Sequence, residues 1–352
     1  RIAAGSLRPG DRLPTRAEIE AMFDTTKVTV QRAFARLLAD GVVVARGRQG
    51  TFVSEDPPQL CNYGLVFPEQ QDEKHWNKFW RVIHNVASEI VRQGKRRLTV
   101  YTGVSKGTAA GDFPQLLEDI EQRRLAGLLF VSPPFLVAGT PAVDAPGLAR
   151  VALMTPTTAS DIPAIGLESD RVLVKSLDRL QERGRRRIAL ITQAGMAGPL
   201  LEDFHAQIAA RGLETKPHWV QVGSLQHPEW SRNLALALFH DDVRTRPDGL
   251  IVTDDNLTEH VYAGVLAAGR RMPEDLEFVS HCNFPPTFPE ALPIHLVGFD
   301  VWELLLTAFH CLDRQRAGEP VPASTILPAR FAEELERPAR AVGAEGEAAA
   351  VP

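Results

Sequence analysis

One helical stretch of this sequence carries the side chains best suited to bind nucleic acid. Lys27, Gln31, Arg32 and Arg36 share one side of this stretch, and the other side is apolar. Lysine and arginine bind backbone phosphates, while glutamine and arginine offer paired hydrogen-bonding groups to the edges of bases. The combination predicts a helix that reads duplex DNA. For Arg36, an ordinary solvated surface position is an equally good interpretation.

Two short helices are expected to hold this surface in place. Thr15 and Glu18 form a capping box that starts the first helix, whose apolar stripe is Ile19, Met22 and Phe23. The second helix starts at Thr25 or Thr26 and stops at Gly41. Its apolar positions repeat at helical spacing and are Val30, Ala33, Phe34, Leu37 and Leu38.

A hairpin is expected to follow the second helix. Two apolar arms, 42–45 and 51–53, flank a tip at 46–50 that contains two glycines and two arginines. Glycines of this kind allow the tight turn, and the arginines add positive charge to it. Residues 5–53 are therefore interpreted as one compact DNA-binding unit.

This unit resembles the winged helix-turn-helix of the GntR family of bacterial transcription regulators. The matching motifs are Pro9-Gly10-Asp11, Leu13-Pro14-Thr15-Arg16, Thr26-Lys27-Val28-Thr29-Val30, Ala33-Phe34, Leu37, Gly41 and Gly50-Thr51-Phe52-Val53. The resemblance implies that the second helix enters the major groove of a double-stranded DNA operator and that the wing tip touches the minor groove. Carried over to this sequence, it implies DNA contacts from Thr15, Arg16, Thr26, Lys27, Thr29, Gln31, Arg32, Arg48 and Gly50.

Two of these positions depart from the family's usual pattern. Lys27 and Gln31 stand where arginines are common. Lysine is a point charge rather than a planar fork, and glutamine favours adenine over guanine. We therefore expect an operator that differs from the family's commonest one. The family also has a further helix before this point, so we expect part of the head to be missing ahead of Arg1.

The distribution of charge separates this head from the rest of the chain. The length of 352 residues predicts two or three domains, and a hydrophobic content of 44% is typical of a soluble globular protein. The net charge is −5, yet residues 1–56 carry nine Lys/Arg against seven Asp/Glu, a charge of +2, which leaves −7 for the remainder. A weakly basic head binds DNA better in two copies, because phosphate contacts add. We expect a homodimer.

From residue 62 onward, candidate strands and helices alternate. Strands are expected at 62–67, 97–101, 127–131, 150–154, 187–191, 219–222, 249–252, 277–280 and 294–299. Helices are expected at 75–93, 113–124, 170–183, 199–211, 229–239, 257–268 and 300–317. This alternation predicts an α/β body with parallel sheets in two lobes, behind an α+β winged helix-turn-helix. Ligands of such sheets bind outside the carboxyl ends of the strands, which here means between the lobes.

Over residues 62–332 the body resembles the effector domain of LacI/GalR repressors, which has the fold of periplasmic sugar-binding proteins. The matching segments are Asn77-Lys78-Phe79-Trp80, 123–131, 167–170, 184–191, 248–255, Gly269 and Pro273-Glu274-Asp275. The resemblance implies that a small, sugar-like effector closes the cleft and changes the spacing of the DNA heads. The effector contacts that it implies are Asn77, Phe79, Trp80, Asp170, Asp255 and Asn283.

Some of these residues also have a structural interpretation. Phe79 and Trp80 either stack on a sugar or pack the first helix of the body, and Asp170 either binds the effector or caps a helix. Asn283 stands where the family usually has aspartate, and an amide is uncharged. Residues 200–204 read Leu-Leu-Glu-Asp-Phe, where sugar-responsive members commonly carry arginine. These departures leave a second hypothesis open, in which the body only dimerises.

The predicted organisation is a winged helix-turn-helix at 1–54, a Pro-Pro linker at 55–61, a two-lobed body at 62–335 and a disordered tail at 336–352. The spacing of Cys61, Cys282 and Cys311 predicts free thiols and no metal site. No apolar run reaches membrane-spanning length, so we expect a protein of the bacterial cytoplasm, at the nucleoid.

A DNA-tethered enzyme that uses pyridoxal phosphate is the third hypothesis. Between residues 107 and 352 its Schiff-base lysine would have to be Lys175 or Lys216, and neither lies near a phosphate-cradling glycine loop. We therefore expect no cofactor and no enzymatic activity. The favoured interpretation is an effector-controlled transcription regulator, and a repressor rather than an activator.

Overall fold

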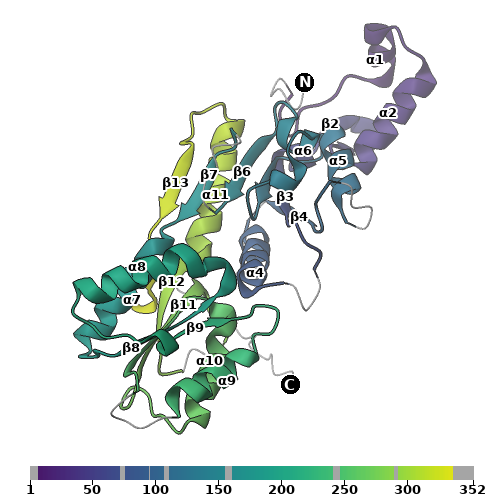
Figure 1. Ribbon diagram of the computed structural model, residues 1–352. Coiled ribbons are helices and arrows are strands. Elements are labelled where there is room, and N and C mark those ends of the chain that lie inside the picture. The colour runs from purple at the N-terminus through teal and green to yellow at the C-terminus, as the bar shows by residue number, and fades with distance from the viewer. Residues whose placement is uncertain are drawn as a thin grey trace, which may run out of the picture.

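The computed structural model consists of a small amino-terminal head and a body of two lobes (Figure 1). The structure describes residues 7–71, 76–94, 96–106, 111–154, 161–240, 246–288 and 292–335. We call the lobe nearer the head the N-lobe and the other one the C-lobe. The predicted tail at 336–352 lies outside the described residues. None of the described helices is long and apolar enough to cross a membrane.

The head contains the predicted two helices and hairpin. Helix α1 (Arg16–Phe23) has Thr15 as its N-cap, with both bonds of the predicted capping box. Helix α2 (Lys27–Ala39) is capped by Thr26, and Gly41 follows it in the left-handed conformation at φ +70°. Strands β1 (Val43–Ala45) and β2 (Thr51–Val53) pair antiparallel around a turn of 3-10 helix, η1 (Gly47–Gln49).

The apolar stripes predicted for these helices are only partly correct. The head core consists of Leu13, Val30, Phe34, Val43 and Val53, with Ile19, Leu37 and Leu38 packed against it. Met22 is 56% exposed, Phe23 is 66% exposed and Ala33 is exposed. An eight-residue helix has about two turns, and Ile19 is the apolar residue of its predicted stripe that packs against the core. No described element covers Met22 and Phe23.

The N-lobe is an all-parallel sheet with the strand order β13-β7-β6-β5-β3-β4. Its strands are β3 (Asn62–Val66), β4 (Arg97–Tyr101), β5 (Gly127–Phe130), β6 (Ala149–Leu153), β7 (Ala164–Leu167) and β13 (Ser324–Leu327). Helices α4 (Lys78–Arg92) and α11 (Val301–Arg316) share one apolar core with the sheet. Helices α5 (Phe113–Glu121) and α6 (Pro141–Asp144) cover the other face.

The C-lobe sheet has the order β14-β12-β11-β10-β8-β9, and the edge strand β14 is its antiparallel member. The strands are β8 (Ile188–Gln193), β9 (Val220–Gly223), β10 (Gly249–Val252), β11 (Glu277–Phe284), β12 (His295–Asp300) and β14 (Arg330–Phe331). Helices α7 (Ser169–Glu182) and α8 (Ala197–Ala210) pack on one face. Helices α9 (Trp230–Phe239) and α10 (Asp255–Ala267) pack on the other.

The chain passes between the lobes at three short segments, which follow β7, β12 and β13. Two of them are joined directly, because the amide of Glu168 donates to the carbonyl of Leu327 at 3.0 Å. The ion pair between Arg330 and Glu303 (2.5 Å) links strand β14 of the C-lobe to helix α11 of the N-lobe. The two lobes are thus joined by three short crossings, two of which are hydrogen-bonded to each other.

Five of the described helices and strands were absent from the sequence prediction, and the four-residue helix α6 is one of them. Strands β7, β13 and β14 have four, four and two residues, and β13 and β14 lie at sheet edges, where only one neighbouring strand stabilises them. Helix α3 (Pro58–Cys61) forms in the segment interpreted as a linker, with Pro57 and Pro58 buried. The helix predicted at 113–124 ends at Glu121, because Arg123 adopts a left-handed conformation at φ +52°.

Close packing of α9 on α10 predicts that Gly264 cannot be enlarged. A Cβ atom at Gly264 would lie 2.2 Å from the carbonyl oxygen of Arg232 and 2.8 Å from Cβ of Ala235. We expect Gly264→Ala to lower the free energy of unfolding by about 1–3 kcal/mol, because the helices must separate. Urea denaturation followed by circular dichroism measures this change.

Gly198→Ala is the matched control, because Gly198 also lies in a helix but nothing surrounds its Cβ position within 4 Å. The control should raise the free energy of unfolding by less than about 1 kcal/mol, since alanine restricts the unfolded chain more than glycine does. Equal effects of the two substitutions would contradict the packing described.

Candidate nucleic-acid interface and interlobe site

The polar side of α2 faces solvent along its length. Val30 and Phe34, which are 2% and 3% exposed, fix the opposite side of the helix in the head core. The predicted contacts Lys27, Thr29, Gln31 and Arg32 are all exposed as a result. Figure 1 places α1 and α2 at the end of the molecule furthest from the C-lobe. The exposed side of α2 can therefore approach a duplex without interference from the C-lobe.

Two of the three threonines among the predicted DNA contacts are helix caps. Thr15 Oγ1 accepts a hydrogen bond from the amide of Glu18 at 3.3 Å, and Thr26 Oγ1 accepts one from the amide of Thr29 at 3.3 Å. The return bond from the Thr15 amide to Glu18, at 2.7 Å, is the main cause of a lowered pKa for Glu18. Both threonines thus fix the starts of the two helices, and both remain exposed.

The wing places its two arginines in different settings. Arg46 lies over the Phe52 ring at 4.8 Å and forms an ion pair with Glu55 at 3.4 Å, whereas Arg48 is exposed on the tip. Gly50 has φ +112°, and a Cβ atom there would lie 2.9 Å from Nε of Arg12. The positive φ favours glycine at this position, and a larger residue would also displace the Arg12 side chain.

The lobes touch where α4 of the N-lobe meets α10 of the C-lobe. Asn77 caps α4 by accepting a hydrogen bond from the amide of Trp80 at 2.9 Å. The backbone amide of Lys78, which follows Asn77 in the sequence, donates to Oδ1 of Asn256 at 2.9 Å. Nζ of Lys78 forms an ion pair with Glu259 at 2.6 Å. Lys78 was not among the predicted site residues. Its position next to a helix cap gave no signal that it would bridge two lobes.

Two carboxylates follow the carboxyl end of β10. Asp255 is 4% exposed and accepts hydrogen bonds from the backbone amide and the side-chain amide of Asn283, both at 3.0 Å. Asp254 caps α10 by accepting from the amide of Asn256 at 2.9 Å. Burial raises the pKa of Asp254, and the neighbouring charge of Asp255 raises it further. The structure thus brings the predicted residues Asp255 and Asn283 into direct contact.

The aromatic residues in the first turn of α4 and just before it are part of the N-lobe packing. Phe79 and Trp80 pack against the N-lobe core, and the Trp80 ring lies 6.0 Å from that of Phe67. Trp76 was missing from the prediction although it is only 5% exposed, and its indole Nε1 has no hydrogen-bond partner among the described residues. Direct contacts therefore support the interpretation that Phe79 and Trp80 pack the first helix of the body.

Asp170 does not join this group. It lies exposed in the first turn of α7, which follows a crossing between the lobes, and no hydrogen bond or ion pair within the described residues links it to Asp255 or Asn283. The alternative prediction that it caps a helix is wrong, because α7 begins at Ser169 and the N-cap is Glu168. A carboxylate in the first turn still stabilises the helix, because it interacts favourably with the positive end of the helix dipole.

The segment 200–204, which lacks the arginine of sugar-responsive proteins, belongs to the C-lobe core. Phe204 is fully buried, and Leu200 and Leu201 pack against the same cluster. The two lysines considered for a Schiff base lie in ion pairs, Lys175 with Glu334 at 2.8 Å and Lys216 with Glu214 at 3.6 Å. Burial raises the pKa of all three cysteine thiols. Within the described ranges, no group of three or more His, Cys, Asp or Glu side chains is placed to hold a metal ion.

Two family models match this chain. Residues 1–53 match bacterial regulatory proteins of the gntR family, and residues 177–332 match a periplasmic binding protein-like domain. The chain is 44% identical over 57 residues to the HTH-type transcriptional regulator TauR of Rhodobacter capsulatus, which covers 16% of this chain and 12% of that protein. Three of the curated relatives are matched over only 12%, 31% and 24% of their length.

A longer match joins the head to the body. The arabinose metabolism transcriptional repressor of Geobacillus stearothermophilus is 22% identical over 287 residues, which cover 72% of this chain and 76% of that protein. A LacI family transcriptional regulator from Arthrobacter sp. FB24, solved in complex with lactose, has the same fold as 77% of this chain, with a TM-score of 0.60 at 15% identity over 97% of its own length. This chain therefore carries a GntR-type DNA-binding head on a two-lobed body of the LacI and periplasmic-binding-protein fold.

The raised pKa of Asp254 predicts how stability changes with pH. The folded chain favours the protonated acid, so the stabilising contribution of protonation is complete below the ordinary carboxyl pKa of 3.8 and is lost as the pH rises through the raised pKa. Asp254→Asn removes this titration and keeps the oxygen that caps α10. We expect the stability of the wild type relative to this variant to fall as the pH rises above about 4.

Thermal unfolding of both proteins across this pH range measures the effect. A stability difference that stays constant with pH would show that Asp254 is not held in a desolvated position.

Proposed function

We propose that this GntR-type head on a periplasmic-binding-protein-like body is a sequence-specific transcription regulator, acting as a repressor, whose DNA binding is controlled by a small sugar-like molecule bound between its lobes. The observation that carries this proposal is the anchored helix α2, which buries Val30 and Phe34 and presents Lys27 and Gln31 to solvent. The proposal rests on the geometry of the head together with its GntR match.

The dimensions of α2 suit the major groove. Thirteen residues give a helix about 20 Å long, and the major groove of B-DNA is about 12 Å wide. Lys27 and Gln31 lie one turn apart and would face the same stretch of base edges. Arg48 on the wing would then contact the adjacent backbone. Dimerisation would double these contacts and set the spacing between two operator half-sites.

Effector control is supported by the way the lobes meet. The bonds from Lys78 to Asn256 and Glu259 hold α4 against α10, close to the buried pair of Asp255 and Asn283. A ligand that binds the closed arrangement better than the open one shifts the population towards closure. Carboxylate and amide groups of this kind bind sugar hydroxyls. The lactose complex of the LacI family regulator with this fold supports a sugar-like ligand class.

A body that serves only as a dimerisation scaffold is the second candidate. Two observations favour it: Asn283 already occupies one carboxylate oxygen of Asp255, and residues Leu200, Leu201 and Phe204 fill the C-lobe core where sugar-responsive proteins commonly carry arginine. In such a protein the head would bind its operator without an effector. A ligand screen separates the two candidates.

The reading face of α2 predicts two kinds of DNA-binding defect. We expect Lys27→Ala and Gln31→Ala to relax sequence preference at one base pair by about 1–3 kcal/mol each, because each removes a base contact. We expect Arg48→Ala to weaken binding evenly across sequences and to lower the slope of log affinity against log salt by about 1, because it removes a phosphate contact. Electrophoretic mobility shifts with duplexes selected from a random pool measure both effects.

The wild-type full chain must show sequence-selective binding in this assay, or the proposed function fails. Unchanged selection by both helix variants would mean that another face of the head reads the bases.

The effector site predicts stabilisation by ligand. We expect at least one compound from a panel of monosaccharides, disaccharides and polyols to raise the melting temperature of the full chain, and a ligand at one hundred times its Kd stabilises by about 2.7 kcal/mol. Asp255→Asn should reduce this shift. Asp178→Asn is the matched control, since Asp178 is an exposed carboxylate on α7 of the same lobe, and it should leave the shift unchanged. If no compound of the panel raises the melting temperature of the wild type, the result favours a body that serves only as a dimerisation scaffold.

A further inference from the structure

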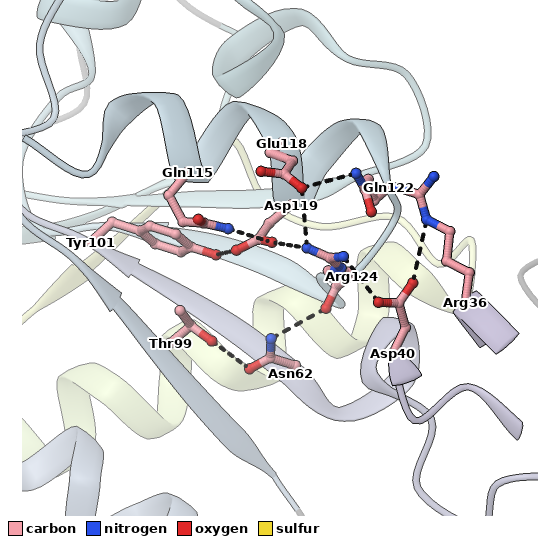
Figure 2. A network of polar contacts seen from close by, with 10 residues as sticks. All are labelled: Arg36, Asp40, Asn62, Thr99, Tyr101, Gln115, Glu118, Asp119, Gln122 and Arg124. Atoms are coloured by element: carbon pink, nitrogen blue, oxygen red, sulfur yellow. Dashed lines mark hydrogen bonds and ion pairs between the residues drawn. The ribbon is translucent and has the colours of Figure 1, made fainter. Parts of the chain in front are cut away.

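One arginine of the N-lobe binds the end of the DNA-reading helix. Arg124 lies in the turn between α5 and β5 and donates from Nη2 to Oδ1 of Asp40 at 2.9 Å. From Nη1 it donates to Oδ1 of Asp119 at 3.1 Å (Figure 2). Asp40 is the C-cap of α2, whereas Asp119 is a residue of α5. A single guanidinium thus joins the head to the body.

The body fixes the backbone of Arg124 and one side of its guanidinium. Asp119 is 8% exposed and also accepts hydrogen bonds from the Tyr101 hydroxyl at 2.7 Å and from Nε2 of Gln115 at 3.0 Å. The carbonyl of Arg124 accepts a bond from Nδ2 of Asn62 at 3.2 Å (Figure 2). Because the N-lobe fixes the backbone and the Nη1 atom of Arg124, the position of its Nη2 atom is fixed as well. The head must bring Asp40 to that position.

Asp40 is poorly suited to the helix that carries it. A carboxylate at the C-terminal end of a helix faces the negative end of the helix dipole. Its side chain is only 15% exposed, and within α2 its ion-pair partner is Arg36, whose Nε lies 3.9 Å away on a side chain that is 59% exposed. Arg124 supplies the opposing charge at 2.9 Å. The contact with the body, rather than the stability of α2, accounts for a carboxylate here.

The linker provides a second attachment that limits rotation of the head. Pro57 and Pro58 are buried, and α3 continues directly into β3 of the N-lobe. Glu55 of the same segment pairs with Arg46 of the wing at 3.4 Å. A head attached to the body only through its linker could still rotate about that linker. The linker and the contact at Asp40 together fix the direction of α2 relative to the N-lobe.

The elements next to Arg124 extend to the opposite edge of the N-lobe sheet. Strand β5 begins just after Arg124 and ends at Phe130, on the carboxyl edge of the sheet. The segment before α5 is tied to that same edge, because Asp112 accepts a bond from the amide of Thr102, at the end of β4, at 2.7 Å. A shift at the carboxyl edge can therefore move the turn that carries Arg124.

We propose that Arg124 is a positioning residue that sets the orientation of α2 relative to the N-lobe through Asp40, so that the state of the body determines how two DNA heads are spaced. The effect of this orientation on DNA binding rests on the proposed function. The head–body contact itself does not, which allows the two to be tested separately.

The first experiment measures head mobility without DNA. Spin labels are placed at Ala35→Cys on α2 and Asn85→Cys on α4, both exposed, in full chain carrying Cys311→Ser and diluted with unlabelled chain. We expect a narrow distance distribution in this background. Arg124→Ala and Asp40→Asn should each broaden it at least twofold, and the double variant should be no broader than either one, because both remove the same contact.

Arg123→Gln is the matched control, since it removes the same charge from the neighbouring, exposed position. It should leave the distribution narrow. Asp40→Asn keeps the shape of the side chain and lies at the edge of the head, so its fold is checked by an unchanged far-ultraviolet spectrum. Equal widths in the background chain, Arg124→Ala and Asp40→Asn would overturn the proposal.

The second experiment measures the consequence for DNA. Duplexes carry two copies of a selected half-site whose separation increases by one base pair at a time over one helical turn. We expect the wild type to prefer its best spacing at least tenfold, and Arg124→Ala and Asp40→Asn to reduce that preference below threefold. Spacing preference retained in both variants would overturn the positioning role. Absence of selective binding by the wild type would overturn the proposed function, while the distance measurement would still decide the role of Arg124.

Discussion

Burial of one side of α2 is the constraint on which the proposed DNA-binding surface depends. Val30 and Phe34 lie one turn apart and pack against residues of both hairpin strands, Val43 and Val53. A helix anchored along one side can expose only the other, so the rotation of α2 about its axis is settled by apolar packing. The same contacts fix the wing relative to the helix. One small core therefore presents the exposed polar side chains of α2 and the wing together.

The head, the N-lobe and the C-lobe each have a core of their own, and polar contacts contribute to the joints between them. Arg124 connects the head to the N-lobe, and Lys78 connects the N-lobe to the C-lobe. Apolar cores resist rearrangement because every displaced side chain loses contacts. Hydrogen bonds and ion pairs at a joint can be exchanged for bonds to water at little net cost. The relative positions of the three units are thus easier to change than the units themselves.

Much of the architecture could be predicted from local patterns. The capping box at Thr15, the helix stop at Gly41 and the alternation of strands with helices all depend on residues close in sequence, and the structure confirms them. Strands β13 and β14 could not be predicted from local patterns, because they lie at sheet edges and pair with β7 and β12, which are distant in sequence. The four-residue strand β7 was missed, although the equally short strands β5 and β10 were predicted. The exposure of Met22 and Phe23 depends on what the rest of the head covers, which helical spacing does not reveal.

The sequence by itself determined the kinds of units and the residue types that each one presents, because helix caps, apolar spacing and turn glycines act over a few residues. The tertiary structure alone decided which polar groups far apart in the sequence meet. Asn283 binds Asp255 from 28 residues away, and Arg124 binds Asp40 from 84 residues away. Neither pair leaves a trace in local sequence, because a side chain's partner is set by how strands are ordered and how units dock. Asp170 shows the converse, since its sequence match gave no information about its neighbours in space.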